Sequence, residues 1–194
     1  MLIKNKAIGV FDSGLGGLTV LKALEAKLPQ ESFIYFGDTA HVPYGSKSVE
    51  TVQNYSNQIT QFLLSHDVKL IVIACNTASS VAAELLRKNF DVPIFGVVTP
   101  SVEQAISLHN GGEIGIIGTQ STIASNSYVE KFTMLAPHIK TVQQACPLFV
   151  PLIEENWSYT NTAKEVASIY LEAISQRPLD AIVLGCTHYP MMEK

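Results

Sequence analysis

Charged residues are scarce in this 194-residue sequence, at 15% of the total, and they form no basic run. Acidic residues outnumber lysine and arginine by 17 to 13, which leaves a formal net charge of -4. Because such a chain lacks the basic surface that binds phosphate backbones, nucleic acid is not expected as its main partner. Apolar residues make up 47% of the sequence, which is enough for a packed core and excludes a disordered or fibrous chain.

Long apolar runs are also missing. The longest, residues 70–75, is far shorter than the roughly 20 residues that span a bilayer, so it is typical of a buried strand. Residues 1–11 are interrupted by Lys4, Asn5 and Lys6 and lack the layout of a signal peptide. The sequence therefore predicts no membrane association and a cytoplasmic location.

Cysteine is rare, with only Cys75, Cys146 and Cys186. An odd and sparse set argues against a disulfide framework, and no Cys-x-x-Cys redox pair occurs. A zinc site needs clustered ligands, and the only close pair is Cys186 with His188, so no metal is expected. The sequence predicts three thiols, of which Cys146 is expected to be inert core.

Short apolar segments alternate with longer segments whose apolar residues recur every three or four positions, which is the pattern of an α/β fold. The expected strands span 8–11, 33–36, 70–74, 94–98, 114–117, 139–143 and 181–184. Most are apolar throughout, as in parallel sheets covered on both faces. Ser101 with Gln104, and Thr162 with Glu165, have the spacing of capping boxes and predict two helix starts.

A shift in composition near residue 99 predicts two domains, 1–98 and 99–194. Residues 71–77 and 182–188 resemble each other, because each is a buried strand that ends in cysteine followed by an amide or hydroxyl residue. This likeness suggests two similar parallel-sheet domains related by pseudo-symmetry.

Ligands of parallel α/β sheets bind at the carboxyl ends of the strands, so the polar residues there are the candidates for a site. These are Asp12, Ser13, Gly14, Asp38, Thr39, Cys75, Asn76, Thr77, Thr119, Cys186, Thr187 and His188. Inverting a carbon stereocentre by proton transfer needs a base on one face and an acid on the other. Two thiols suit this chemistry, because a helix N-terminus or a nearby cation can lower a thiol pKa from about 8.5. A thiol hydrolase that uses Cys186 and His188 is an alternative, although it leaves Cys75 unexplained.

Four blocks at these strand ends resemble glutamate racemase when they are taken together. They are Asp-Ser-Gly-Leu-Gly-Gly-Leu-Thr-Val at 12–20, Gly-Asp-Thr-Ala-His-Val-Pro-Tyr-Gly at 37–45, Ala-Cys-Asn-Thr-Ala-Ser at 74–79 and Gly-Cys-Thr-His-Tyr-Pro at 185–190. The resemblance implies a cofactor-independent interconversion of L- and D-glutamate that supplies peptidoglycan synthesis. It also implies an active site in the cleft between the two domains.

The resemblance assigns roles to single residues. Cys75 is expected to take the proton from D-glutamate, and Cys186 the proton from L-glutamate. The residues expected to bind the substrate are Asp12, Ser13, Tyr44, Gly45, Asn76, Thr77, Thr187 and His188. Asp12 and His188 resemble the groups that assist the thiols, and Glu154 is a weaker candidate of the same kind.

Two departures from the family leave alternatives open. His41 stands where the family often has arginine. The family also continues for several tens of residues beyond the equivalent of Lys194 and returns to complete the first domain, which is otherwise expected to be incomplete. A racemase for aspartate and a shortened, inactive relative that binds glutamate are therefore alternatives. A homodimer is compatible with the sequence.

Overall fold

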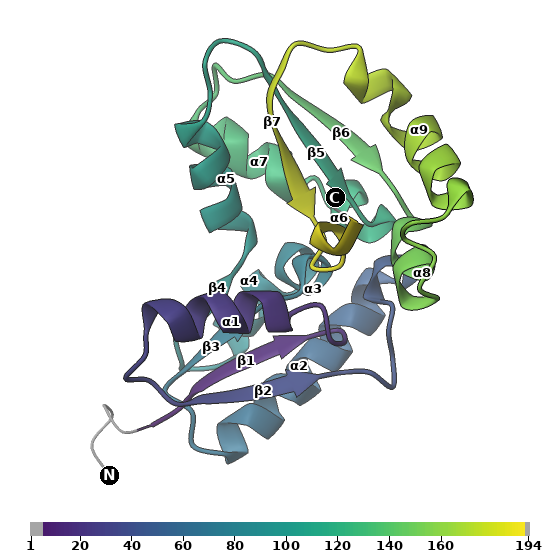
Figure 1. Ribbon diagram of the computed structural model, residues 1–194. Coiled ribbons are helices and arrows are strands. Elements are labelled where there is room, and N and C mark those ends of the chain that lie inside the picture. Colours follow the sequence, from purple (N-terminus) through teal and green to yellow (C-terminus); the bar gives the residue numbers. More distant parts are fainter. Residues whose placement is uncertain (1–5, 193–194) are drawn as a thin grey trace. The chain divides into compact units, whose positions relative to one another are not determined.

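Each of the two units of the chain contains one parallel sheet. The first unit ends at Val97 and the second begins at Val98. The computed structural model describes residues 6–192 and is drawn in Figure 1. All strand pairs in both sheets are parallel. The predicted fold class, α/β with two parallel-sheet domains, is confirmed.

The sheet of the first unit has the strand order β2-β1-β3-β4. Its strands are β1 (Ile8–Asp12), β2 (Phe33–Gly37), β3 (Leu70–Ile73) and β4 (Ile94–Gly96). Its helices are α1 (Leu18–Lys27), η2 (Tyr44–Ser46), α2 (Val49–Ser65), α3 (Asn76–Val81) and α4 (Ala83–Asn89). Because β1 and β3 are central, their carboxyl ends lie side by side, and residues 12 and 75 emerge at the same edge of the sheet.

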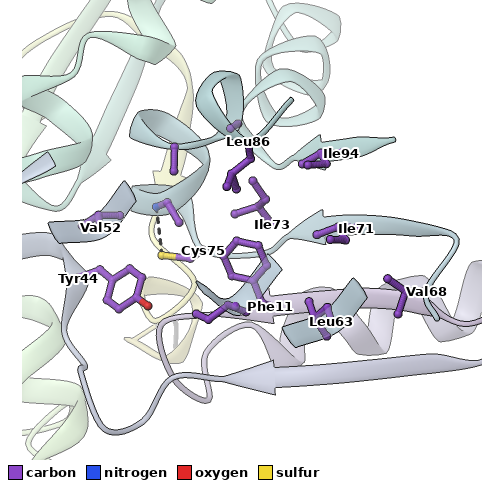
Figure 2. Close-up of a cluster of buried hydrophobic side chains, with 14 residues drawn as sticks. Phe11, Tyr44, Val52, Leu63, Val68, Ile71, Ile73, Cys75, Leu86 and Ile94 are labelled. Carbon is purple, nitrogen blue, oxygen red and sulfur yellow. Dashed lines mark hydrogen bonds between the residues drawn. The ribbon is translucent and has the colours of Figure 1, made fainter. Parts of the chain in front are cut away.

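Alternate side chains of the central strands enter opposite faces of this sheet, as the period of a strand requires. Ile8 and Val10 pack against α1, whereas Phe11 and Ile73 pack against α2, α3 and α4. Figure 2 shows the second of these clusters, with Cys75 and Tyr44 at one end and Val68 at the other. A thiol at the border of an apolar core is therefore held by close packing.

The sheet of the second unit has the order β6-β5-β7. Its strands are β5 (Glu113–Gly118), β6 (Thr141–Ala145) and β7 (Leu179–Gly185). Its helices are α5 (Val98–Ser107), α6 (Gln120–Ala124), α7 (Ser127–Leu135), α8 (Phe149–Glu154), α9 (Asn161–Ser175) and η3 (Tyr189–Met192). Ile114 and Ile116 pack against α5 and α7, and Ile117 belongs to the cluster that includes Phe149 of α8 and Ile174 of α9.

Both helix starts predicted from capping boxes are wrong. Ser101 lies inside α5, which already begins at Val98 because Pro100 is tolerated in a first turn, where its missing N–H has no helical partner to lose. Thr162 lies inside α9, and the true N-cap is Thr160, whose hydroxyl accepts a hydrogen bond from the backbone N–H of Ala163 at 3.2 Å.

The seven expected strands all form, with shifted ends. The strand expected over 94–98 ends at Gly96, and the strand expected over 139–143 is β6, Thr141–Ala145. None of the helices in residues 6–192 combines the length and apolar character needed to cross a membrane.

Candidate active site

The turn that follows β1 is fixed by its own side chain and by close packing. Asp12 is fully buried, and its Oδ2 accepts a hydrogen bond from the backbone N–H of Gly14 at 2.9 Å. Gly17 packs directly on Asp12, since a Cβ at residue 17 would lie 2.4 Å from the Asp12 Cβ. Only glycine allows this approach, so the glycine-rich segment brings the chain back onto Asp12 before α1 begins.

Cys75 ends the neighbouring strand and is the N-cap of α3. Its Sγ accepts a hydrogen bond from the backbone N–H of Ala78 at 3.4 Å, shown dashed in Figure 2. Ser13 contributes two further contacts: its backbone N–H donates to the Cys75 sulfur, and its hydroxyl oxygen accepts from the Cys75 thiol at 3.7 Å and can donate in turn to the thiolate. The thiol is 4% exposed, so these fixed donors replace most of its hydration.

Opposing influences act on the pKa of Cys75. Burial and the negative charge of Asp12 raise it, whereas the hydrogen bonds from Ala78 and Ser13 lower it, and the result is a rise from 9.0 to about 11. In the protein without substrate, the thiol form of Cys75 therefore predominates near neutral pH.

Tyr44 and Gly45 lie on η2, and a polar group holds Tyr44 in place. The Tyr44 hydroxyl donates to Asp38 Oδ2 at 2.6 Å, and His41 Nδ1 lies 2.8 Å and 3.0 Å from the two Asp38 oxygens. The His41 ring stacks on Tyr55, with ring centroids 4.2 Å apart. Burial, the hydrogen bond to Asp38 and the charges of Asp38, Cys75 and Asp12 raise the pKa of Tyr44, so its hydroxyl remains a donor.

Asn76 and Thr77 occupy the first turn of α3 and are buried. The first unit thus contains six of the predicted binding residues together with Cys75. They lie at the end of β1, on η2 and directly after β3. His41, which stands where the family often has arginine, is paired with Asp38.

The second unit holds its thiol in a different way. Cys186 follows β7 and is buried, and its Sγ lies 3.9 Å from His188 Nδ1. His188 is also buried, and its Nε2 lies 2.6 Å from Glu154 Oε1 at the end of α8. This arrangement joins thiol, imidazole and carboxylate in series. A glutamate in such a position is usually a solvated surface residue. Glu154 is nevertheless the partner of His188, although its side chain is 47% exposed.

After Thr187 the described chain forms the short 3-10 helix η3, so a long helix does not begin there to lower the pKa of a thiol. Thr187, the residue after Cys186, is also buried. Thr119 has a local role, because its hydroxyl accepts a hydrogen bond from the backbone N–H of Thr122 and caps α6.

Cys146 lies in the same apolar cluster as Cys186 and is fully buried. Burial raises the pKa of the Cys146 thiol from 9.0 to about 12. Such a thiol is a poor acid or base near neutral pH. None of the three cysteines, all within the described residues, forms a disulfide. Residues 6–192 contain no group of three or more His, Cys, Asp and Glu side chains that could hold a metal ion.

Sequence reasoning missed Tyr35 of β2. Its hydroxyl donates to the backbone carbonyl of Gly14 at 2.8 Å, within the turn that carries Asp12 and Ser13. The strand pattern gave a weak signal, because a tyrosine on a strand next to β1 has a polar end that needs a partner when it is partly buried.

Residues 8–194 match the family model described as Asp/Glu/Hydantoin racemase. A glutamate racemase from Geobacter metallireducens is 49% identical over 189 residues, which cover 97% of this chain and 70% of the relative. A solved glutamate racemase isoform from Bacillus anthracis is 37% identical with a TM-score of 0.93, covering 97% of this chain and 71% of that one. A Francisella tularensis glutamate racemase, solved with D-glutamate, is 40% identical with a TM-score of 0.91 and has the same coverage.

The chain belongs to the Asp/Glu/Hydantoin racemase family. The predicted class of enzyme, an amino-acid racemase, is confirmed by this membership and by relatives of high identity over nearly the whole chain. Within the family, the predicted resemblance to glutamate racemase is also confirmed.

Proposed function

We propose that this chain interconverts L- and D-glutamate without a cofactor, with Cys75 and Cys186 as the two proton-transferring groups. The observation that carries the proposal is that Cys75 and Cys186, buried thiols at strand ends in different units, each contact polar groups of their own unit. The bound D-glutamate of the Francisella tularensis relative supports glutamate as the substrate. We further propose that the product supplies D-glutamate for peptidoglycan.

The proposed reaction consists of two proton transfers. From D-glutamate, the Cys75 thiolate removes the α-proton, so the Cα–H bond breaks and an S–H bond forms. The Cys186 thiol then donates its proton to the opposite face of the α-carbon, so its S–H bond breaks and the new Cα–H bond forms. L-Glutamate reacts in the reverse order. The reaction requires one thiolate and one thiol at the start of each turnover.

Substrate binding itself favours the Cys75 thiolate in this mechanism. The Asp12 carboxylate raises the Cys75 pKa through its negative charge. When the substrate ammonium pairs with Asp12, that charge is compensated, and the Cys75 pKa falls toward the range that the hydrogen bonds from Ser13 and Ala78 favour. Deprotonation is thereby coupled to the presence of substrate.

The second thiol uses an imidazole. His188 Nδ1 faces the Cys186 Sγ, and Glu154 on Nε2 orients the ring. His188 can therefore take the thiol proton when Cys186 acts as a base. The substrate carboxylates are bound by hydroxyl, amide and backbone donors of Ser13, Gly45, Asn76, Thr77 and Thr187.

The test is circular dichroism of the purified chain with D-glutamate and with L-glutamate in deuterium oxide. We expect the optical signal of either enantiomer to decay, with solvent deuterium entering the α-position of the product. Faster turnover of aspartate than of glutamate would favour the aspartate alternative. Binding in calorimetry without any decay of the optical signal would favour an inactive glutamate-binding protein.

One observation favours a second candidate. Cys186, His188 and Glu154 form the series of nucleophile, base and orienting carboxylate that thiol hydrolases use. That function predicts a covalent adduct of Cys186 with an ester substrate and hydrolysis that is indifferent to Cys75→Ser. The cytoplasmic location and the homodimer stay predictions.

A further inference from the structure

Tyr35 reaches the turn after β1 from the neighbouring strand. β2 pairs with β1 in register, with Tyr35 opposite Val10, and both residues belong to the cluster that packs against α1. The hydroxyl donates to the Gly14 carbonyl at 2.8 Å, and a Cβ at residue 17 would lie 2.9 Å from the Tyr35 oxygen. The hydroxyl is thus enclosed by the glycine-rich turn.

Gly14 is consequently held on both sides. Its N–H donates to Asp12 Oδ2 at 2.9 Å, and its carbonyl accepts from Tyr35. Gly37 tightens this arrangement, because a Cβ there would lie 2.4 Å from the Gly14 carbonyl oxygen. Ser13 lies between the two anchored residues, so its backbone and its side chain have little freedom to move away from the Cys75 Sγ.

We propose that Tyr35 is a positioning residue for Cys75: by holding the Gly14 carbonyl, it keeps the Ser13 N–H and hydroxyl on the Cys75 sulfur and so stabilises the thiolate. Tyr35 touches neither the substrate nor the sulfur in this role. It acts through the turn, in which the N–H and the hydroxyl of Ser13 are two of the groups that stabilise the Cys75 thiolate. Its effect on turnover rests on the proposed function, whereas its effect on the thiol does not.

A tyrosine suits this position because its hydroxyl keeps its proton. Burial and the charges of Asp12 and Cys75 raise the pKa of Tyr35, so it remains a donor when Cys75 is ionised. The titratable groups that interact with Cys75 come from three elements: Asp12 of β1, Tyr35 of β2 and Tyr44 of η2. Of these, only Tyr35 donates to the turn that carries Ser13.

The experiment measures the rate at which iodoacetamide alkylates Cys75 as a function of pH, by mass spectrometry of the peptide that contains it. In Tyr35→Phe, we expect the rate at mildly alkaline pH to fall about threefold, as expected when one neutral hydrogen bond that favours the thiolate is lost. The pH profile should shift by about half a unit to higher pH, because one unit corresponds to a tenfold change in the thiolate fraction. The kcat for D-glutamate should fall by a similar factor.

Tyr159→Phe is the matched control. Tyr159 is exposed in the second unit, and its hydroxyl donates to the backbone carbonyl of Met191 at 3.2 Å, so the variant removes the same kind of hydrogen bond far along the chain from Cys75. The Cys75 alkylation profile of this variant should match that of the unmodified chain. An equal fall in both variants, or no fall in Tyr35→Phe, overturns the proposal.

A double-mutant cycle with Ser13→Ala separates a positioning role from a merely structural one. If Tyr35 acts through Ser13, Tyr35→Phe should slow alkylation less in the Ser13→Ala background than in the unmodified chain. Full additivity, or a loss of thermal stability with an unchanged alkylation profile, contradicts the proposal. Because alkylation needs no turnover, it tests Tyr35 even if the chain does not racemise glutamate.

Discussion

The two thiols proposed to react, Cys75 in the first unit and Cys186 in the second, each follow a strand, yet their surroundings differ in kind. Cys75 contacts hydrogen-bond donors of Ser13 and Ala78 and experiences the negative charge of Asp12. Cys186 faces the imidazole of His188, which Glu154 supports. Fixed backbone dipoles stabilise a thiolate but cannot accept its proton, whereas an imidazole can do both. Similar strand ends therefore support two different ways of preparing a thiol.

A thermodynamic constraint decides how this comparison can be tested. L- and D-glutamate have equal free energies in an achiral solvent, so kcat/KM must be equal in the two directions for every variant. A loss at either thiol therefore lowers both directions together. The individual thiols are distinguished by the alkylation of each cysteine and by solvent exchange of each enantiomer.

The largest expected effect comes from removing either thiol. Cys75→Ser and Cys186→Ser should each lower racemisation about a thousandfold, which is within the range of a general acid or base. Circular dichroism with D-glutamate measures the loss. Cys146→Ala is the control, because Cys146 is buried in apolar surroundings, and this variant should retain activity within about threefold.

Solvent exchange should then separate the two thiols. In Cys186→Ser, Cys75 can still remove the α-proton of D-glutamate, so deuterium should enter unreacted D-glutamate in preference to L-glutamate. Cys75→Ser should show the reverse preference. Full racemisation in either variant, or the same exchange preference in both, would refute the two-thiol mechanism.

The imidazole of the second unit should have the next largest effect. His188→Asn should lower kcat about thirtyfold, less than a residue that takes the substrate proton itself, and Glu154→Gln should have a smaller effect. Alkylation of Cys186 should slow in both variants, while that of Cys75 stays unchanged. Glu155→Gln is the matched control, because it removes the charge of the adjacent exposed residue. Equal losses in Glu154→Gln and Glu155→Gln would exclude a specific role for the contact with His188.

Asp12→Asn should affect the first thiol in two opposite ways. Removing the charge lowers the Cys75 pKa. Alkylation of Cys75 near neutral pH should therefore accelerate about tenfold, as a fall of about one unit in that pKa produces. Racemisation should nevertheless fall, because the variant loses the carboxylate proposed to pair with the substrate ammonium. Asp67→Asn, at an exposed acidic residue with positive φ that asparagine tolerates, is the control. Slower alkylation in Asp12→Asn would contradict the repulsion between Asp12 and Cys75.

The sequence predicted those parts of the fold and site that depend on position along a strand. Uninterrupted apolar segments identified the parallel strands, and the rule that ligands bind at strand ends selected Asp12, Ser13, Cys75 and Cys186. Prediction failed where two distant segments meet. The contact of Tyr35 with Gly14 depends on the register of β2 with β1, which a single sequence does not contain.

The same limit explains the other differences. From the sequence alone, Asp38 is as suited to holding a turn as to binding a ligand. Its contacts with Tyr44 and His41 depend on where η2 lies, which the sequence pattern does not contain. The capping boxes failed for a local reason, because the motif of four residues also occurs inside α5 and α9, which begin earlier, at Val98 and after the N-cap Thr160.

An effect on stability rather than on rate is expected at high pH, where the buried thiols of Cys75 and Cys146 act in the same direction. Folding raises the pKa of Cys75 from 9.0 to about 11 and that of Cys146 from 9.0 to about 12. A raised pKa means that the folded protein holds the proton more tightly. The stabilisation is therefore complete below pH 9 and is lost as the pH rises toward 11 for Cys75 and 12 for Cys146, by at most about 1.4 kcal/mol per pH unit for each thiol.

Urea unfolding at a series of pH values above 8 tests this loss, with Cys75→Ala and Cys146→Ala compared with the unmodified chain. Each variant should show a shallower fall in the free energy of unfolding, because it lacks one thiol that ionises on unfolding. Buried tyrosines with raised pKa values titrate in all three proteins, so the difference in slope isolates the thiol. The benefit of Cys146→Ala should extend to higher pH than that of Cys75→Ala, because Ser13 and Ala78 hold the Cys75 pKa down and Cys146 has only burial acting on it. Identical slopes in the three proteins would mean that neither thiol is buried in the way the structure describes.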